Sequence, residues 1–281
     1  MEILVCYNRG MNRHNMPLDA FASGAEARGN KVDKVMTDDF FYKPDPELVI
    51  LFGSGAGNRG YNAKRKYEVL RYCKKKKIPY VKIEEAFIKR DEYWSVTING
   101  LGRDGYYLHK EIESDRISNT TSIKPFKWSG DYILLTKQLP RDANVGIPPV
   151  EYRKWLYNMM EYLVQFDYQL VIREHPKIKS SKTTIEEDLQ NARMLVTYSS
   201  TTAVDAAIAG VPFYVENPRS VVYDLRVRPK DIDGNIPSYE HQYNVLNEVA
   251  HAQWTLKEMH EGQCWDHLYK ILKSKDLCKE K

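Results

Sequence analysis

With 281 residues and a formal net charge of +4, the chain is long enough for two domains of ordinary size, each burying its own core. Charged residues of both signs are spread along it, and no apolar run approaches the roughly 20 residues of a membrane helix, which excludes a helical membrane protein. The first residues are typical of a buried strand rather than a signal peptide, so a cytoplasmic location is expected.

The cysteines and the charge distribution further limit which kinds of site and partner the protein can have. The cysteines show neither CxxC nor Cys/His spacing, which argues against a zinc site and a disulfide scaffold: Cys6, Cys73, Cys264 and Cys278. Residues 1–128 hold 23 Lys and Arg against 17 Asp and Glu, so the excess positive charge lies in the first half. A basic first half favours an anionic acceptor such as nucleic acid or an acidic glycan.

Residues 1–83 alternate strands and helices as in a parallel α/β sheet. Strands are expected at 3–7, 31–36, 48–52 and 79–83, and helices at 16–28 and 62–77. Arg9, in the loop after the first strand, is a candidate cleft residue. A glycine-rich segment with Gly55 and Arg59 follows the third strand. It lacks the G-K-[ST] ending of a Walker loop and predicts either a phosphate-facing loop or a flexible connection.

Carboxylates follow the fourth strand. Glu84 and Glu85 are placed to act as a general base or to bind sugar hydroxyls, with a solvated turn as the alternative. The pair Asn99-Gly100 predicts a hairpin within residues 93–107, and Asp104 in that segment is a further candidate base. Residues 109–128 are expected to form a polar helix and a linker, which divides the chain into domains 1–128 and 129–281.

The second half repeats the α/β pattern, with polar clusters at strand ends. Strands are expected at 131–136, 168–172, 194–197 and 213–215, with helices at 149–166, 203–209, 240–251 and 255–274. The polar clusters after the second, third and fourth of these strands are Arg173, His175 and Pro176; Ser199, Ser200, Thr201 and Thr202; and Glu216. Ligands bind at the carboxyl ends of such strands, and a helix N-terminus favours an anion, so a phosphate-bearing ligand is predicted. The alternative is an N-cap cluster with nothing bound.

The order H-P, then S-S-T-T at a helix start, then A-G-V-P resembles the donor half of GT-B glycosyltransferases, most closely the capsule-synthesis Kdo-transferase group. The resemblance implies that His175, Pro176, Ser199 and Ser200 contact the nucleotide of a sugar donor. The segment after residue 136 resembles the Q-x-x-x-D element of that group, which implies that Gln138 lies in the cleft and that Asp142 is the catalytic base. An Asx-type turn after Pro140 is the alternative for Asp142.

Two further segments carry weaker resemblances. The segment E-E-A-F-I-K-R resembles the E-D-G-F-L-R turn of the Kdo-transferase group and adds Arg90 to the cleft candidates, although Ala86 replaces the glycine and a lysine precedes Arg90. Residues 246–265 resemble the tail of small glycosyltransferase-like proteins of tailed phages. The D-x-D at 231–233 lies among turn-forming residues and is interpreted as a turn, so no metal site is expected.

The α/β alternation predicts two Rossmann-like domains with parallel sheets, and the resemblance implies the GT-B class, in which the two domains face each other across a cleft. The predicted function is transfer of a sugar from a nucleotide-linked donor, CMP- or UDP-linked, to a hydroxyl acceptor, with no cofactor and no obligatory metal. Asp142 would be the base, with Glu85, Glu84 or Asp104 in reserve.

The favoured acceptor is a hydroxymethylated pyrimidine in phage DNA, which would place the protein in the host cytoplasm. The alternatives are a Kdo-type or other sugar transferase of capsule or lipopolysaccharide synthesis, a nucleotide-sugar epimerase, and a non-catalytic module that binds nucleotide-sugar or nucleic acid.

Overall fold

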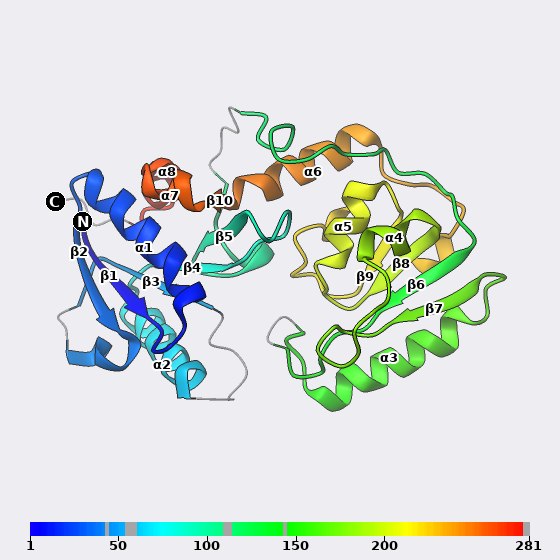
Figure 1. The fold of residues 1–281 in the computed structure, drawn as a ribbon, viewed down its shortest axis with the longest axis horizontal. Helices are drawn as coiled ribbons and strands as arrows, with labels where there is room; N and C mark the ends of the chain where they lie inside the picture. Colours follow the sequence, from blue (N-terminus) through cyan, green and yellow to red (C-terminus); the bar gives the residue numbers. More distant parts are fainter. Residues whose placement is uncertain (43–44, 54–60, 109–113, 143–144, 278–281) are drawn as a thin grey trace. The chain divides into compact units, whose positions relative to one another are not determined.

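The computed structural model describes residues 1–42, 45–53, 61–108, 114–142 and 145–277, which form two compact units (Figure 1). The first unit combines Met1–Ser114 with His251–Lys281, and the second is Asp115–Ala250. Each unit is an α/β layer structure around its own sheet. None of the helices within the described ranges is long and apolar enough to cross a membrane.

The first unit is built on a six-stranded sheet in the order β10-β5-β4-β3-β1-β2. Its strands are β1 (Glu2–Tyr7), β2 (Lys31–Met36), β3 (Leu48–Phe52), β4 (Tyr80–Glu85), β5 (Tyr93–Ile98) and β10 (Gln253–Thr255). The first four run parallel, and β5 and β10 extend one edge with antiparallel pairing. All of β3 is buried, as expected for a strand covered on both faces.

Helices cover both faces of this sheet (Figure 1). On one face α1 (Asn12–Ala27), α7 (Leu256–His260) and α8 (Gln263–Ser274) pack in a core that includes Phe21 and Trp265. On the other face α2 (Tyr61–Lys76) contributes Val69, Leu70 and Cys73 to a second core. The two cores together hold the carboxyl ends of β1, β3 and β4 at one edge of the sheet.

The second unit is built on a fully parallel sheet in the order β7-β6-β8-β9. Its strands are β6 (Tyr132–Thr136), β7 (Gln169–Arg173), β8 (Ala192–Thr197) and β9 (Phe213–Val215), and its helices are α3 (Pro149–Leu163), α4 (Ile185–Gln190), α5 (Thr202–Ala209) and α6 (Tyr239–His251). The core under α3 holds Ile133, Leu135 and Leu163. Short 3₁₀ turns lie at Thr37–Tyr42, Gly102–Asp104, Tyr223–Leu225 and Pro229–Asp231.

Most predicted elements are present, with small shifts at their ends. Three expectations were wrong. The described part of 109–128 contains no helix. The predicted helix 255–274 is two helices, because Gly262 takes a left-handed backbone with φ +83° between them. The Asn99-Gly100 turn is not a two-residue hairpin, because the backbone N–H of Asn99 bonds to Tyr80 and only Ile98 and Tyr106 form a bridge beyond it.

The predicted domain boundary also needs correction at the end of the chain. Residues 251–281 were assigned to the second domain, yet β10 pairs with β5, and α7 and α8 pack in the first unit's core. The division falls after residues 114 and 250 rather than at 128. The physical reason is that the apolar face of α1 and the edge strand β5 are covered only when the last residues return to them.

Candidate functional site

The four parallel strands of the second unit all end at one edge of the sheet, and the predicted donor residues follow them there. Gln138 and Asp142 come after β6, His175 after β7, Ser199 after β8 and Glu216 after β9. The pairing of β6 with both β7 and β8 brings the first three of these loops side by side. The sheet topology therefore gathers residues that are far apart in the sequence, as the strand-end rule requires.

A buried amide joins the loops after β6 and β8. The side chain of Gln138 is 6% exposed, and its Oε1 accepts a 2.8 Å hydrogen bond from the backbone N–H of Ser199. Its Nε2 donates to Oγ of the same serine at 3.1 Å. The backbone N–H of Gln138 donates to the hydroxyl of Tyr152, which fixes the loop against α3. This two-point contact holds Ser199 at the start of the turn that leads into α5.

The N-terminus of α5 offers backbone donors. The backbone N–H of Ser199 donates to Gln138. The N–H groups of Ser200 and Thr201 make no hydrogen bond within the part of the chain that the structure describes. The hydroxyl of Ser200 accepts from the N–H of Thr202, and the hydroxyls of Thr202 and Thr136 bond to each other at 2.9 Å. Two N–H groups at a helix start, in a field that favours anions, suit a phosphate oxygen.

His175 lies close to Asp142. Burial lowers the pKa of the His175 imidazole, and the charge of Asp142 acts in the opposite direction. Its Nδ1 accepts from the backbone N–H of Lys177, which leaves Nε2 as the ring nitrogen that carries the proton in the neutral form. The imidazole is therefore a neutral hydrogen-bond donor at pH 7, and the half-buried carboxylate of Asp142 is near it.

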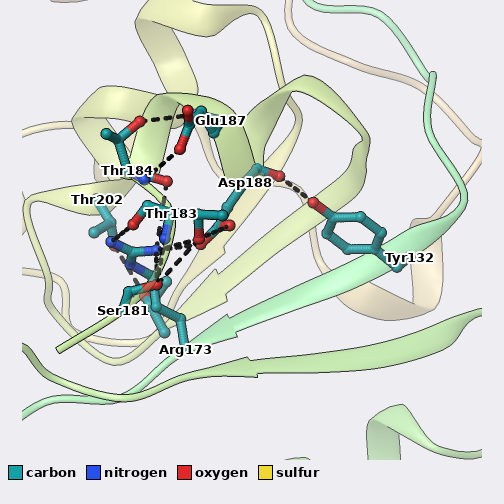
Figure 2. Close-up of polar contacts among 9 residues, drawn as sticks. Tyr132, Arg173, Ser181, Thr183, Thr184, Glu187, Asp188 and Thr202 are labelled. Atoms are coloured by element: carbon teal, nitrogen blue, oxygen red, sulfur yellow. Dashed lines mark hydrogen bonds and ion pairs between the residues drawn. The ribbon is translucent and has the colours of Figure 1, made fainter. Parts of the chain in front are cut away.

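Arg173 has partners inside the protein (Figure 2). Its guanidinium forms an ion pair with Asp188 and donates to Oγ of Ser181 and to the backbone oxygen of Thr183, both at 3.0 Å. The backbone oxygen of Asp188 also accepts from the hydroxyl of Tyr132. Arg173 thereby ties the loop after β7, which carries His175, to α4. Its expected direct contact with the donor stays a prediction.

Glu216 is oriented by two donors. The same carboxylate oxygen, Oε2, accepts from Nε1 of Trp155 at 2.9 Å and from the hydroxyl of Tyr214 at 2.7 Å. Burial is the main cause that raises the pKa of the Tyr214 hydroxyl, and the bond to Glu216 adds to it. Oε1 has no hydrogen-bond partner among the described residues, so it is placed to accept from a ligand hydroxyl.

The structure adds two aromatic residues that the sequence analysis did not place at the site. Tyr152 and Trp155 come from α3 and stack at 5.9 Å, and each also contacts the ring of Tyr198 edge to face. Tyr152 holds Gln138 and Trp155 holds Glu216, so they position two of the predicted site residues. Their i, i+3 spacing on a helix was the available signal, but the same spacing is typical of plain core.

The first unit holds the remaining candidates. Glu84 and Glu85 lie at the end of β4 rather than in a turn, and Glu85 forms an exposed 3.2 Å ion pair with Arg13. Burial raises the pKa of Glu84, and Lys66 and Lys82 oppose that rise. The exposed candidates of this unit are Arg9, Arg90 and Asp104. Gly55 and Arg59 lie outside the described residues.

The D-x-D segment is a turn, as predicted. Asp233 has φ +66°, and its carboxylate accepts from Tyr168 and Arg193. Within the described ranges, no group of three or more His, Cys, Asp and Glu side chains is arranged to hold a metal ion.

Comparisons with known proteins bear on the fold. No family model and no curated protein sequence matches the chain. Among solved structures, Thermosulfurimonas dismutans KpsC, beta Kdo 2,4 transferase, is similar with a TM-score of 0.50 and 13% identity over 90% of each chain. The beta Kdo 2,7 transferase of KpsC from the same organism has a TM-score of 0.48 and 12% identity, over 94% of this chain and 99% of that one. Methanocaldococcus jannaschii UDP-GlcNAc 2-epimerase, solved with UDP-GlcNAc and UDP, has a TM-score of 0.34 and 12% identity, over 98% of this chain and 100% of that one.

At these identities the likeness concerns the fold. Two α/β units with parallel strands and a similarity to a Kdo transferase over nine-tenths of both chains confirm the predicted class, an α/β protein with two Rossmann-like domains of GT-B type.

Proposed function

We propose that the protein is a glycosyltransferase whose second unit binds the nucleotide-sugar donor. The observation that carries the proposal is the pair of unbonded N–H groups of Ser200 and Thr201 at the start of α5, held beside the Gln138–Ser199 contact. Backbone donors preorganised at a helix start stabilise negative charge on a leaving phosphate without rearranging during the reaction. The fold likeness to a Kdo transferase supports sugar transfer as the type of reaction.

The other residues at this edge fit complementary roles. Oε1 of Glu216 would accept a hydrogen bond from a ribose hydroxyl, and Nε2 of neutral His175 would donate to a diphosphate or monophosphate oxygen. Asp142 would take the proton of the acceptor hydroxyl as its oxygen bonds to the anomeric carbon and the bond from that carbon to the donor phosphate breaks. No step in this scheme requires a metal or a cofactor.

The donor and the acceptor are proposed as chemical classes. A CMP- or UDP-linked sugar is the expected donor. The basic first half favours a hydroxymethylated pyrimidine in phage DNA as acceptor, and a Kdo-type transfer to a capsule or lipopolysaccharide glycan is the rival. A salt titration of duplex binding separates them, because binding to phosphates weakens steeply as salt rises and a glycan acceptor needs no duplex contact.

Thermal-shift measurements with CMP, UDP, GDP and ADP test the donor role. A nucleotide present at about 100 times its Kd adds about 2.7 kcal/mol of stability, which is a shift of several degrees in Tm. Gln138→Ala should abolish the shift because Ser199 and the α5 start lose their anchor, whereas Gln165→Ala, at an exposed position just after α3, should leave it unchanged. Absence of a shift with all four nucleotides would contradict the proposal.

The catalytic role of Asp142 has its own test. Asp142→Asn should keep the nucleotide shift and reduce sugar transfer by at least about 100-fold, the usual contribution of a positioned base. Donor turnover without any acceptor would instead indicate a nucleotide-sugar epimerase. Unchanged function in the Asn variant would indicate a binding module without catalysis.

A further inference from the structure

The carboxyl edge of the first unit's sheet carries a buried side chain with unused hydrogen-bonding capacity. Asn8 follows β1 and is 1% exposed, yet its Oδ1 and Nδ2 make no hydrogen bond with any residue of the described ranges. Its backbone is held firmly, because its N–H donates to Oδ1 of Asn15 and its oxygen accepts from Nδ2 of Asn15, both at 3.0 Å. The amide of Asn8 is therefore fixed in place without partners of its own.

A lysine and a carboxylate lie at the same sheet edge as this amide: Glu84 lies at the end of a strand two places away, and Lys66 of α2 reaches the position between them. Cys6 pairs with Leu51 and Phe52 pairs with Ile83, so Asn8, Gly53 and Glu84 follow on in adjacent rows at the sheet edge. A Cβ on Gly53 would lie 2.9 Å from Nζ of Lys66 and 3.7 Å from Oε1 of Glu84. Because Gly53 has no side chain, these two charged groups converge over its backbone.

The two charged groups are desolvated. Lys66 comes from α2 and is 8% exposed; burial lowers its pKa, while the charge of Glu84 opposes the change. Burial raises the pKa of Glu84, and the charges of Lys66 and Lys82 oppose that change. A buried ammonium near a half-buried carboxyl group is costly to keep unless each group is offset by hydrogen bonds or an opposite charge.

A third unsatisfied atom lies close by. His14 stacks on Phe52 with ring centroids 4.2 Å apart, and its buried Nδ1 has no hydrogen-bond partner among the described residues. Burial, and after it the charge of Lys66, lower the pKa of His14, so the ring is neutral at pH 7. A buried polar group without a partner costs about 1–3 kcal/mol. Three such atoms near two desolvated charged groups indicate a site built for a ligand rather than for stability.

We propose that Asn8, Lys66 and Glu84 form a binding site for the hydroxyl groups of a sugar. A sugar hydroxyl both donates and accepts hydrogen bonds. Adjacent hydroxyls of one sugar can therefore accept from the ammonium, donate to the carboxylate and do either with the amide. The inference rests on the proposed function only in giving that sugar the role of acceptor; the binding itself is independent of the donor site.

Two other ligand classes fit less well. A nucleobase is usually held between free aromatic faces, but Phe52 already stacks on His14 and makes a T-shaped contact with Trp94. A free phosphate would meet the carboxylate of Glu84 at close range, and like charges in a desolvated site repel strongly. The site therefore favours a neutral, hydroxyl-rich group.

Saturation-transfer NMR on the full chain tests the proposal, with the neutral methyl glycosides of glucose, galactose, mannose and xylose as probes. At least one should bind the wild-type protein. Asn8→Leu and Lys66→Met should each weaken that binding at least about 10-fold, the effect of removing one good hydrogen bond to a charged or buried group. Lys64→Met, an exposed position on the same helix, should bind as the wild type does.

Stability measurements separate a ligand site from a structural one. Asn8→Leu replaces an unsatisfied amide with an apolar side chain of similar shape, so its Tm should equal or exceed that of the wild type while sugar binding is lost. Its nucleotide-induced thermal shift should be unchanged, which separates failure of this proposal from failure of the donor assignment. A lower Tm in Asn8→Leu, no binding of any of the four sugars, or displacement of the bound sugar by inorganic phosphate or free cytidine would overturn the proposal.

Discussion

At the scale of single residues, the first unit has a lysine at a buried sheet position, where an apolar side chain is usual. Lys82 lies in β4 and is 9% exposed. Burial lowers its pKa to about 8; Lys74 adds to the lowering, and Glu84 and Asp104 oppose it. A buried lysine of this kind changes its charge within an accessible pH range, which makes its environment measurable.

Lys82 should give the folding stability a defined pH dependence. The folded state releases this proton near pH 8 and the unfolded chain near pH 10.5, so between these values the unfolded chain binds more protons. The free energy of unfolding due to this group therefore rises with pH across the window, by at most about 3 kcal/mol. Urea unfolding of wild type and Lys82→Met at pH 7.5, 9 and 10 measures the difference.

Comparison with the variant removes the contribution of the tyrosines and cysteines, which titrate in both proteins. The exposed Lys64→Met provides a second reference and should show no pH-dependent difference from the wild type. A wild-type advantage over Lys82→Met that shrinks as pH rises would contradict the assigned direction.

At the scale of elements, the loop after β7 is shaped by α4 rather than by its own sequence. The capping box of α4, formed by Thr184 and Glu187, sets the start of the helix, and Asp188 in its first turn receives the guanidinium of Arg173 (Figure 2). Both members of this ion pair are mostly buried, at 14% and 16% side-chain exposure. The loop that carries His175 is therefore held at its start by the sheet and at its end by this helix.

Removing the charge of Asp188 should destabilise the second unit. Asp188→Asn leaves the guanidinium of Arg173 without its counter-charge, which should cost on the order of 1–3 kcal/mol. Glu186→Gln removes one negative charge from the same helix turn at an exposed position and should change stability by less than about 0.5 kcal/mol. Thermal unfolding followed by circular dichroism compares them, and equal effects would mean that only the helix dipole is involved.

At the scale of the whole molecule, the chain leaves the first unit and returns to it. The returning residues add β10 to the sheet edge and contribute Trp254, Met259, Trp265 and Leu268 to the core around α1. Gly24 of α1 permits the contact, because a Cβ there would lie 1.9 Å from the backbone oxygen of Met259. The first unit is therefore incomplete until the last residues have been made.

Fragments should show this dependence directly. Burying one large apolar side chain contributes about 1.5–3 kcal/mol, so losing the returning residues removes an amount comparable to the about 5–15 kcal/mol of a typical domain. The fragment 1–128 should not unfold cooperatively, whereas 115–250 should. Thermal melts and the dispersion of amide NMR signals report both.

A joined fragment is the matched control. Nε2 of His251 lies 3.1 Å from the backbone oxygen of Ser114, so a short Gly/Ser linker can connect residue 114 to residue 251. That joined chain should fold cooperatively. A cooperative transition in 1–128 alone would show that the returning residues are dispensable.

Local patterns in the sequence predicted much of the fold and part of the site. Alternating apolar strands and helices, together with stops such as Gly29 and Gly210, predict the parallel units, because these signals act within a few residues. The rule that ligands bind at strand ends predicted that His175 and Ser199 lie at one edge of the sheet, and the resemblance to the Kdo-transferase group added Gln138. The bond between Gln138 and Ser199 could not be predicted, since it depends on which strands pair.

The residues 168–218 by themselves determined a βαβ pattern with polar clusters at the strand ends, because periodicity and helix-start chemistry are written into short segments. Only the tertiary structure decided what each side chain does. In the structure Arg173 pairs with Asp188, the side chain of Asn8 has no hydrogen-bond partner among the described residues, and residues 251–281 belong to the first unit. The return of residues 251–281 depends on contacts between segments more than a hundred residues apart, and the state of Asn8 depends on the burial of single atoms. The pairing of Arg173 with Asp188 depends on where α4 packs after the loop, and none of the three leaves a local pattern in the sequence.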